Sequence, residues 1–278
     1  MIISIMAQGT MGAGTAARLT ENGVLIRTIL GGRSAASAKR AGEAGMVDAP
    51  LADFVDADFI LSIVPPGEAL TFARTVAGAL RDTAKAPVFV DLNAINPETA
   101  RKVEAEVTAA GARFVDGGII GGPPRPGYDP VYYVSGPEAG TATGLIPLGL
   151  DVRVLDGPVG AASALKMSYA GITKGTTALA ATMILAASRN GAADALLAEL
   201  KRSQPDRLAA FERGVPDMLG KAYRWVAEME EISGFIGKDL PEHGIYEAIA
   251  RLYERLAADR VGDGEEADML KAFFAARD

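Results

Sequence analysis

The chain has 278 residues, 49% of them hydrophobic, which is enough for two domains and a sizeable buried core. Its formal net charge of −7 argues against nucleic acid or an anionic membrane surface as a partner. It has no cysteine and one histidine, His243, which excludes disulfides, cysteine nucleophiles, and metal sites built from thiolates or several histidines.

The beginning of the chain carries no basic segment of the kind found in signal peptides. The longest apolar candidate for a membrane span, residues 159–187, contains Lys166 and Lys174. These features predict a cytoplasmic protein without a membrane partner.

Apolar runs of strand length alternate with helical segments over the first 157 residues. Strands are expected at Ile2–Met6, Val24–Leu30, Phe59–Val64, Val88–Leu92, Phe114–Ile120, Val131–Ser135 and Val152–Leu155. Asn96 and Pro97 form a helix-start signal, and Gly111 marks the end of that helix. The alternation predicts an α/β fold with a doubly wound, mainly parallel sheet of the Rossmann type.

After Gly157 and Pro158 the strand signals stop. Residues 159–190 are rich in Ala, Gly, Thr and Ser, which predicts one helix about 45 Å long at ~1.5 Å per residue. Its small side chains permit close approach of other backbones and suggest a homodimer. Amphipathic helices are expected at Ala192–Arg202, Asp206–Phe211, Val215–Ser233, Pro241–Ala258 and Gly264–Arg277. We therefore predict a nucleotide-binding domain over residues 1–157 and an all-helical substrate and dimerisation domain over residues 158–278.

A glycine-containing turn follows the first strand. Its residues are Ala7, Gln8, Gly9, Thr10, Met11 and Gly12. Backbone N–H groups at the start of the next helix, aided by the helix dipole, can hold a pyrophosphate. Gly9 lets the backbone approach the phosphates, and Gly12 lets the helix lie close to the strand. Because Ala7 replaces the usual first glycine, a glycine turn in some other α/β protein stays an alternative.

The end of the second strand bears on which dinucleotide is bound. An NAD-binding protein usually has an acidic residue there, which binds the ribose 2′-hydroxyl. This chain has Arg33 and Ser34 instead, and a guanidinium with a hydroxyl suits a 2′-phosphate. The sequence therefore favours NADP(H) over NAD(H); the alternative is that Arg33 is a solvated residue at a helix start.

Four further segments, in the same order along the chain, carry a family resemblance. They are Ser62–Pro66, Asp91–Pro97, Asp116–Gly122 and Gly160–Lys166. With the glycine turn they resemble the β-hydroxyacid dehydrogenase superfamily over about residues 1–175. That group includes 6-phosphogluconate and 3-hydroxyisobutyrate dehydrogenases and the imine reductases. The region around Glu228 resembles a branch with a poorly characterised C-terminal domain.

The resemblance implies that Lys166 is the general acid or base, and that Val64 and Pro65 contact the cofactor. Lys166 lies in an apolar stretch, and desolvation there would lower the pKa of its ammonium group toward a useful value. The alternative is a lysine that reaches from a helix face to water. Tyr169 follows one turn later, as a polar contact with the substrate or as a packing residue.

Two segments are expected to hold the substrate. Asn93 lies just past the C-terminal end of a strand, where open α/β sheets bind ligands, and its alternative role is to stabilise a turn. Gly121 and Gly122 can present backbone N–H groups to a carboxylate, or form a plain loop.

Three departures from the family pattern concern the substrate. Ile120, Ala94 and Ala170 replace the family's usual serine, threonine and asparagine. The lost polar groups favour a bulkier or less polar substrate.

These observations predict an NADP(H)-dependent oxidoreductase that acts on a small hydroxyacid or the corresponding carbonyl compound. One alternative is an imine reductase, although imine reductases generally lack the lysine. The other is a nucleotide-binding sensor without turnover, which the hydroxyls missing at residues 94 and 120 favour.

Overall fold

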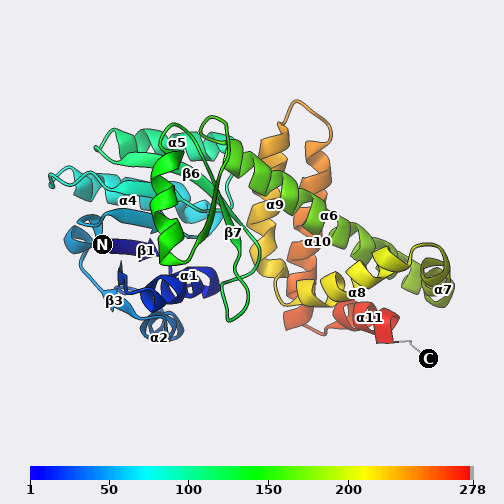
Figure 1. Ribbon diagram of the computed structural model, residues 1–278. Coiled ribbons are helices and arrows are strands. Elements are labelled where there is room, and N and C mark those ends of the chain that lie inside the picture. Colours follow the sequence, from blue (N-terminus) through cyan, green and yellow to red (C-terminus); the bar gives the residue numbers. More distant parts are fainter. Residues whose placement is uncertain (276–278) are drawn as a thin grey trace. The chain divides into compact units, whose positions relative to one another are not determined.

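The computed structural model describes residues 1–275, and the chain forms two compact units (Figure 1). The first unit comprises Met1–Met167 and the second begins at Ser168. The first contains the whole sheet, which confirms the predicted α/β class, and the second is helical. The functional boundary between residues 157 and 158 stays a prediction; it lies between the last strand and the long helix.

The sheet has eight strands in the order β3-β2-β1-β4-β5-β6-β7-β8. The strands are β1 (Ile2–Met6), β2 (Leu25–Thr28), β3 (Met46–Asp48), β4 (Phe59–Ser62), β5 (Val88–Asp91), β6 (Arg113–Ile120), β7 (Val131–Ser135) and β8 (Asp151–Val154). All neighbours are parallel except β6 and β7, which are antiparallel. The predicted doubly wound, mainly parallel sheet is confirmed.

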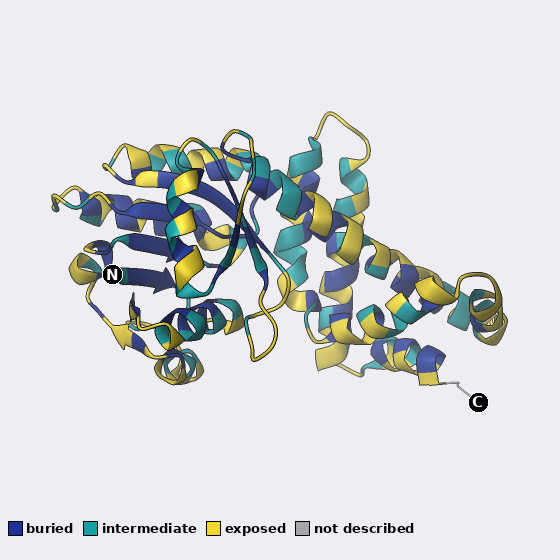
Figure 2. Cartoon of the chain, viewed as in Figure 1, coloured by how far each residue is buried: buried dark blue, intermediate teal, exposed yellow. Residues whose placement is uncertain are grey.

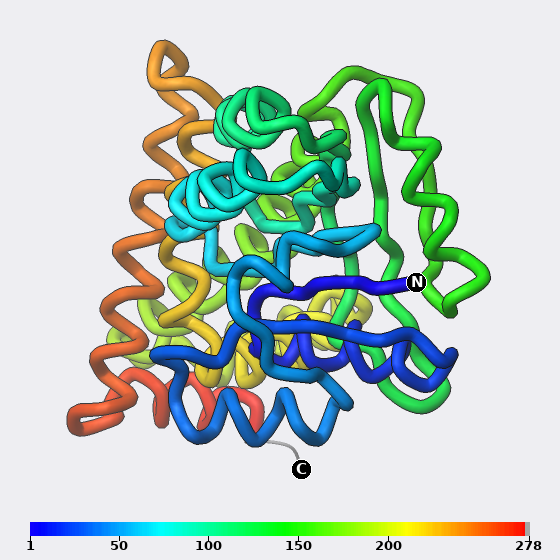
Figure 3. The backbone as a smooth tube through the Cα atoms, turned by 90° about the vertical axis from the view of Figure 1, so that its left-hand side faces the viewer, coloured from blue at the N-terminus to red at the C-terminus, as the bar shows by residue number. Residues whose placement is uncertain are grey.

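Helices cover both faces of this sheet, as Figures 1 and 3 show. On one face the sheet packs against α1 (Thr10–Glu21), α2 (Ala35–Glu43) and the 3₁₀ helix η2 (Ala139–Leu148). On the other it packs against α3 (Leu51–Val55), α4 (Ala69–Leu80) and α5 (Pro97–Thr108). A short 3₁₀ helix, η1 (Pro66–Glu68), precedes α4.

The central strands are buried on both faces, which Figure 2 shows in dark blue. On the α4 and α5 side, four phenylalanine rings pack in series with centroids 6.0 to 6.3 Å apart. They are Phe54, Phe72, Phe89 and Phe114. Both faces of these strands are removed from water. Their sequences are therefore continuous apolar runs rather than alternating apolar and polar residues.

The second unit begins within the long helix α6 (Ala161–Arg189). It continues with α7 (Ala193–Ser203), α8 (Pro205–Leu219), α9 (Ala222–Ile236), α10 (His243–Val261) and α11 (Glu265–Ala275). By length and composition α6 is able to cross a membrane, but so is the core helix of many soluble proteins, and 44% of its most apolar window is buried.

The structure differs from the sequence expectations for helices and strands in two places. The edge strand β3 was not expected, because it has three residues and Val47 is half exposed, which leaves no apolar run to detect. A single helix over Val215–Ser233 was expected, but α8 continues through Pro216 and ends at Leu219. Met218 and Leu219 are buried, and their packing stabilises the helix beyond the proline. The last two residues of the helix expected at Gly264–Arg277 lie outside the described residues.

Candidate functional site

The glycine turn between β1 and α1 has the geometry of an anion site. Gly9 is the N-cap of α1, no side chain caps the helix, and its first turn contains no acidic residue. A Cβ at Gly9 would meet nothing within 4 Å, whereas one at Gly12 would lie 1.8 Å from the Ala7 carbonyl oxygen. Gly9 thus leaves space in front of the helix, and Gly12 permits the close approach of helix and turn.

Gln8 holds this turn from inside. Its side chain is buried, and the amide donates to the Thr28 hydroxyl and to the carbonyl oxygen of Ile29, 2.9 Å away. The amide therefore ties the turn to the end of β2. Thr10 is exposed and Met11 is half-buried at the start of α1.

Two arginines follow β2: Arg33 lies just before α2, and Arg40 lies in the last turn of α2. Arg33 is exposed, and Ser34 caps α2 by accepting a hydrogen bond from the Ser37 N–H. Arg40, which the sequence analysis did not single out, donates from Nε to the Gln8 carbonyl oxygen at 3.0 Å and from Nη2 to the Ser37 hydroxyl at 3.1 Å. Arg40 thereby links α2 to the glycine turn.

Asn93 joins the carboxyl ends of β4 and β5. It is 2% exposed; its Oδ1 accepts from the Val64 N–H at 2.6 Å, and its Nδ2 donates to the Ser62 hydroxyl at 2.8 Å. These contacts give Asn93 a structural role as the organiser of the segment that contains Val64 and Pro65. Its contact with substrate or cofactor stays a prediction.

A buried carboxylate pair lies beneath this edge. Asp91 on β5 and Asp116 on β6 are register partners on parallel strands. Asp91 Oδ1 accepts from the Asn93 N–H at 2.9 Å, and Oδ2 has no partner within residues 1–275. Burial raises the pKa of Asp91 to about 7; the Asn93 N–H opposes the rise and the charge of Asp116 adds to it.

Asp116 fixes the start of α6. Its buried carboxylate accepts hydrogen bonds from the hydroxyls of Ser135 and Ser163 and from the backbone N–H groups of Gly160, Ala162 and Ser163, at 2.6 to 3.1 Å. A carboxylate at a helix N-terminus satisfies N–H groups that have no partner within the helix. The first turn of α6 is therefore anchored to β6.

This anchor places Lys166 above the end of β6. A Cβ on Gly118 would lie 2.9 Å from Lys166 Cβ, so only glycine admits the lysine side chain here. Lys166 Nζ donates to the Ile119 carbonyl oxygen at 2.8 Å. The ammonium group is thus held near the carboxyl end of the sheet, where open α/β sheets bind ligands. Tyr169 follows on α6 and is 49% exposed.

The predicted substrate loop carries a tyrosine that the sequence analysis missed. Gly121 has φ +126°, and the Gly122 N–H donates to the Tyr128 hydroxyl at 3.0 Å. Of the two amides expected to face a substrate, one is therefore paired with Tyr128.

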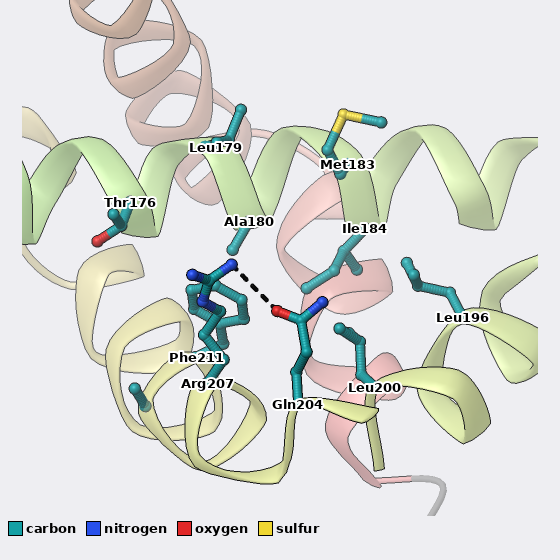
Figure 4. Close-up of a pocket in the computed structure, with 11 residues that line it drawn as sticks. Thr176, Leu179, Ala180, Met183, Ile184, Leu196, Leu200, Gln204, Arg207 and Phe211 are labelled. Atoms are coloured by element: carbon teal, nitrogen blue, oxygen red, sulfur yellow. Dashed lines mark hydrogen bonds between the residues drawn. The ribbon is translucent and has the colours of Figure 1, made fainter. Parts of the chain in front are cut away.

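The second unit contains apolar grooves along α6. Figure 4 shows one of about 480 Å³ between α6, α7 and α8, lined mainly by aliphatic side chains such as Leu179, Met183 and Leu200. Its polar pair, Gln204 and Arg207, is bonded internally at 3.0 Å. A second groove of about 410 Å³ lies between α6 and α10. Within the described residues no group of acidic and histidine side chains is arranged to hold a metal ion.

Residues 3–144 match the NAD binding domain of 6-phosphogluconate dehydrogenase. The chain belongs to this family. Residues 187–256 match a domain of unknown function, DUF1932. The uncapped α1 N-terminus and the space in front of Gly9 fit a dinucleotide pyrophosphate.

Two proteins without an assigned function are similar to this chain over two thirds or more of its length. An uncharacterised 28.5 kDa protein of Methanothermus fervidus is 28% identical over 192 residues, 68% of this chain and 72% of the relative. A conserved protein of unknown function, whose structure is described as similar to 3-hydroxyacid dehydrogenases, is 28% identical, with a TM-score of 0.71 over 94% of this chain and 98% of its own.

Two less similar structures share the fold alone. Mycobacterium tuberculosis 3-hydroxyisobutyrate dehydrogenase, solved with L-serine, is 20% identical, with a TM-score of 0.68 over 93% of this chain and 94% of its own. An imine reductase from Myxococcus stipitatus in complex with NADP+ is 20% identical, with a TM-score of 0.55 over 98% and 99% of the two chains. Their likeness to this chain shows that the fold occurs in a dehydrogenase and in an imine reductase.

Three residues of the candidate site gave no sufficient signal in the sequence. Arg40 lies on the helix that Ser34 caps, and its contact with Gln8 joins residues 32 apart in the chain. Asp116 stood within a family-like segment, but its partners lie 19 to 47 residues further along the chain. Tyr128 occupies a proline-rich loop whose folding back onto Gly122 depends on the loop geometry.

Proposed function

We propose that the protein is an NADP(H)-dependent oxidoreductase that acts on the CH–OH group of a small hydroxyacid, or on the corresponding carbonyl compound. The observation that carries this proposal is the ammonium group of Lys166, held by the Ile119 carbonyl near the end of β6. The glycine turn follows β1, which two strands, β4 and β5, separate from β6. At ~4.8 Å per strand, roughly 14 Å separates the two places, a span suited to an extended dinucleotide.

When bound, the nicotinamide would accept or supply the hydride. The chain's own part is to position the substrate and to handle the proton. Lys166 exchanges a proton with the substrate oxygen that becomes a carbonyl or a hydroxyl. Gly121, Gly122 and Asn93 line the neighbouring strand ends, and the contact of Tyr169 with the substrate stays a prediction.

Turnover should depend on Lys166. A spectrophotometric screen would combine NADP+ with hydroxyacids, and NADPH with keto acids and imines. We expect Lys166→Ala to lower kcat at least 100-fold, because a positioned acid or base contributes about 10²- to 10⁴-fold. Its nucleotide Kd should stay at the wild-type value. Equal turnover by the variant would refute the role of the lysine.

The preference for NADP(H) is supported by Arg33, which follows β2 and is exposed, and by Arg40, which donates to the Gln8 carbonyl oxygen in the glycine turn. Guanidinium groups suit a 2′-phosphate, and no acidic residue stands in their place. Isothermal titration of Arg33→Ala should show a Kd for NADPH raised at least 10-fold and a Kd for NADH nearly unchanged. Lys39→Ala is the matched control, since Lys39 lies on the same helix and pairs with Glu43. Equal weakening of both nucleotides would contradict the phosphate assignment.

The same screen distinguishes the alternatives. The fold is shared with an imine reductase, so turnover of imines but not of keto acids would favour that activity. Tight nucleotide binding without turnover of any compound would favour a sensor. Lys166 supports the hydroxyacid reaction over both, because neither alternative needs an ammonium group at Ile119.

We further propose that the protein acts in the cytoplasm as a homodimer.

A further inference from the structure

The loop between β6 and β7 folds into a tight hairpin. Arg125 and Tyr128 exchange two backbone hydrogen bonds, at 3.0 and 2.9 Å. Gly127 has φ +75°, which a glycine adopts without strain. The Arg125 guanidinium lies over the Tyr128 ring, 5.1 Å from its centroid. The hairpin therefore presents a cation and a phenol as one stacked pair.

This hairpin is attached to α1, the helix that begins at the glycine turn. A Cβ at Gly14 would lie 3.0 Å from a ring carbon of Pro124, so the proline packs directly on the helix backbone. Arg18 donates to the Arg125 carbonyl oxygen at 3.3 Å and pairs with Asp129 at 2.8 Å. These contacts position the hairpin relative to the helix N-terminus.

The Tyr128 hydroxyl lies against the backbone of the predicted substrate loop. It accepts the Gly122 N–H at 3.0 Å, and a Cβ at Gly121 would lie 2.4 Å from its oxygen. A phenol can also donate one hydrogen bond. No acceptor for that hydrogen exists among residues 1–275, and the residue is 37% exposed.

The guanidinium group of Arg125 is also able to bind a carboxylate. The neighbouring acidic residue, Asp129, pairs with Arg18, and no ion pair between described side chains includes Arg125. An arginine beside a phenol with a free donor hydrogen is suited to a carboxylate, which accepts charge-assisted hydrogen bonds from both.

We infer that Tyr128 and Arg125 form the subsite for the carboxylate of the substrate. This inference rests on the proposed function, and it assigns the specificity for an acid to this pair. Gly122 is three residues beyond Ile119, which holds Lys166; at ~3.5 Å per residue the two backbones are at most about 11 Å apart. The Tyr128 hydroxyl also supplies a donor close to Ile120, whose own side chain offers none.

Binding of matched compounds tests the subsite without turnover. The probe is 3-hydroxyisobutyrate, and its uncharged analogue is 2-methyl-1,3-propanediol, in which CH₂OH replaces the carboxylate. Both are titrated calorimetrically into the full chain with NADP+ present. We expect Tyr128→Phe to weaken binding of the acid about 10-fold and leave the diol unchanged, because a hydrogen bond to a charged group is lost. Arg125→Gln should weaken the acid at least as much.

Tyr223→Phe is the matched control, since Tyr223 is an exposed tyrosine under another arginine, Arg224, at 5.8 Å. It should bind both compounds as the wild type does. A second readout is the amide resonance of Gly122, which should shift on addition of the acid in the wild type and much less in Tyr128→Phe. The Kd for NADPH should be equal in all variants.

The outcomes separate the subsite from the proposed function. If Lys166-dependent turnover of a hydroxyacid is found and Tyr128→Phe binds that acid normally, the subsite is wrong and the function stands. Equal weakening of the binding of acid and diol would also overturn the subsite, because that result indicates a general packing defect. If neither 3-hydroxyisobutyrate nor 3-hydroxybutyrate nor lactate binds the wild type, both proposals fail.

Discussion

At the scale of single residues, the buried pair of Asp91 and Asp116 makes stability depend on pH. The pKa of Asp91 is about 7, against 3.8 for an ordinary aspartate. Because the folded pKa is raised, the folded state holds a proton that the unfolded state releases between these values. The contribution of Asp91 is therefore fully favourable below about pH 4 and is lost progressively as the pH rises through about 7.

Urea unfolding at pH 5.5 and pH 8 would measure this effect. We expect the wild type to be more stable at pH 5.5, and Asp91→Asn to lose most of the difference because its amide does not titrate. Asp58→Asn is the control: the Ile2 N–H lowers the pKa of Asp58, so its effect lies at more acidic pH. An unchanged pH dependence in Asp91→Asn would contradict the assignment.

At the scale of elements, the decisive contact is the one between Asp116 and the first turn of α6. The carboxylate accepts three backbone N–H bonds and two hydroxyl bonds in a buried setting. Asp116→Ala would leave these donors without their acceptor, and we expect a loss of at least ~2 kcal/mol in the free energy of unfolding.

Chemical denaturation measures that loss, and Asn96→Ala gives the comparison. Asn96 caps α5 with two hydrogen bonds near the surface, so its removal should cost only about 1 kcal/mol. Asp116→Ala should also lower turnover at temperatures where the chain stays folded, because Lys166 lies one turn beyond the anchored residues. A cost no larger than that of Asn96→Ala would show that the anchor is dispensable.

At the scale of the whole molecule, α6 carries large apolar side chains that are exposed. Ile172, Leu179 and Met183 are 68%, 63% and 54% exposed, and two apolar grooves adjoin them. Contiguous apolar surface of this kind is typical of an association site. It supports the proposed homodimer, in which a second copy would cover α6.

Light scattering after size exclusion would test the dimer. The chain has a mass of 28.8 kDa, and we expect the wild type at about twice that value. Leu179→Glu should give the single-chain mass, because a buried charge without a partner is costly. Val261→Glu, at an 89% exposed apolar residue outside the grooves, should leave the mass unchanged. A monomeric wild type would refute the proposal.

Local signals in the sequence accounted for most of the first unit. The strands β1 and β7 have the predicted limits, and α5 begins at Pro97 with Asn96 as the predicted N-cap. The glycine turn was recognisable because strand, turn and helix follow one another in the chain. The sequence did not predict helix limits correctly where tertiary packing outweighed helix propensity. An example is α8, which continues through Pro216.

By itself, the sequence determined the class of fold, the succession of apolar strands and the place of the dinucleotide turn, because hydrophobic periodicity and turn chemistry act over a few neighbouring residues. Only the tertiary structure decided which polar groups meet. Asp116 reaches N–H groups 44 to 47 residues away, and Tyr128 turns back onto Gly122. Such pairings depend on strand order and on the directions of side chains, which exist only once distant parts of the chain have packed together.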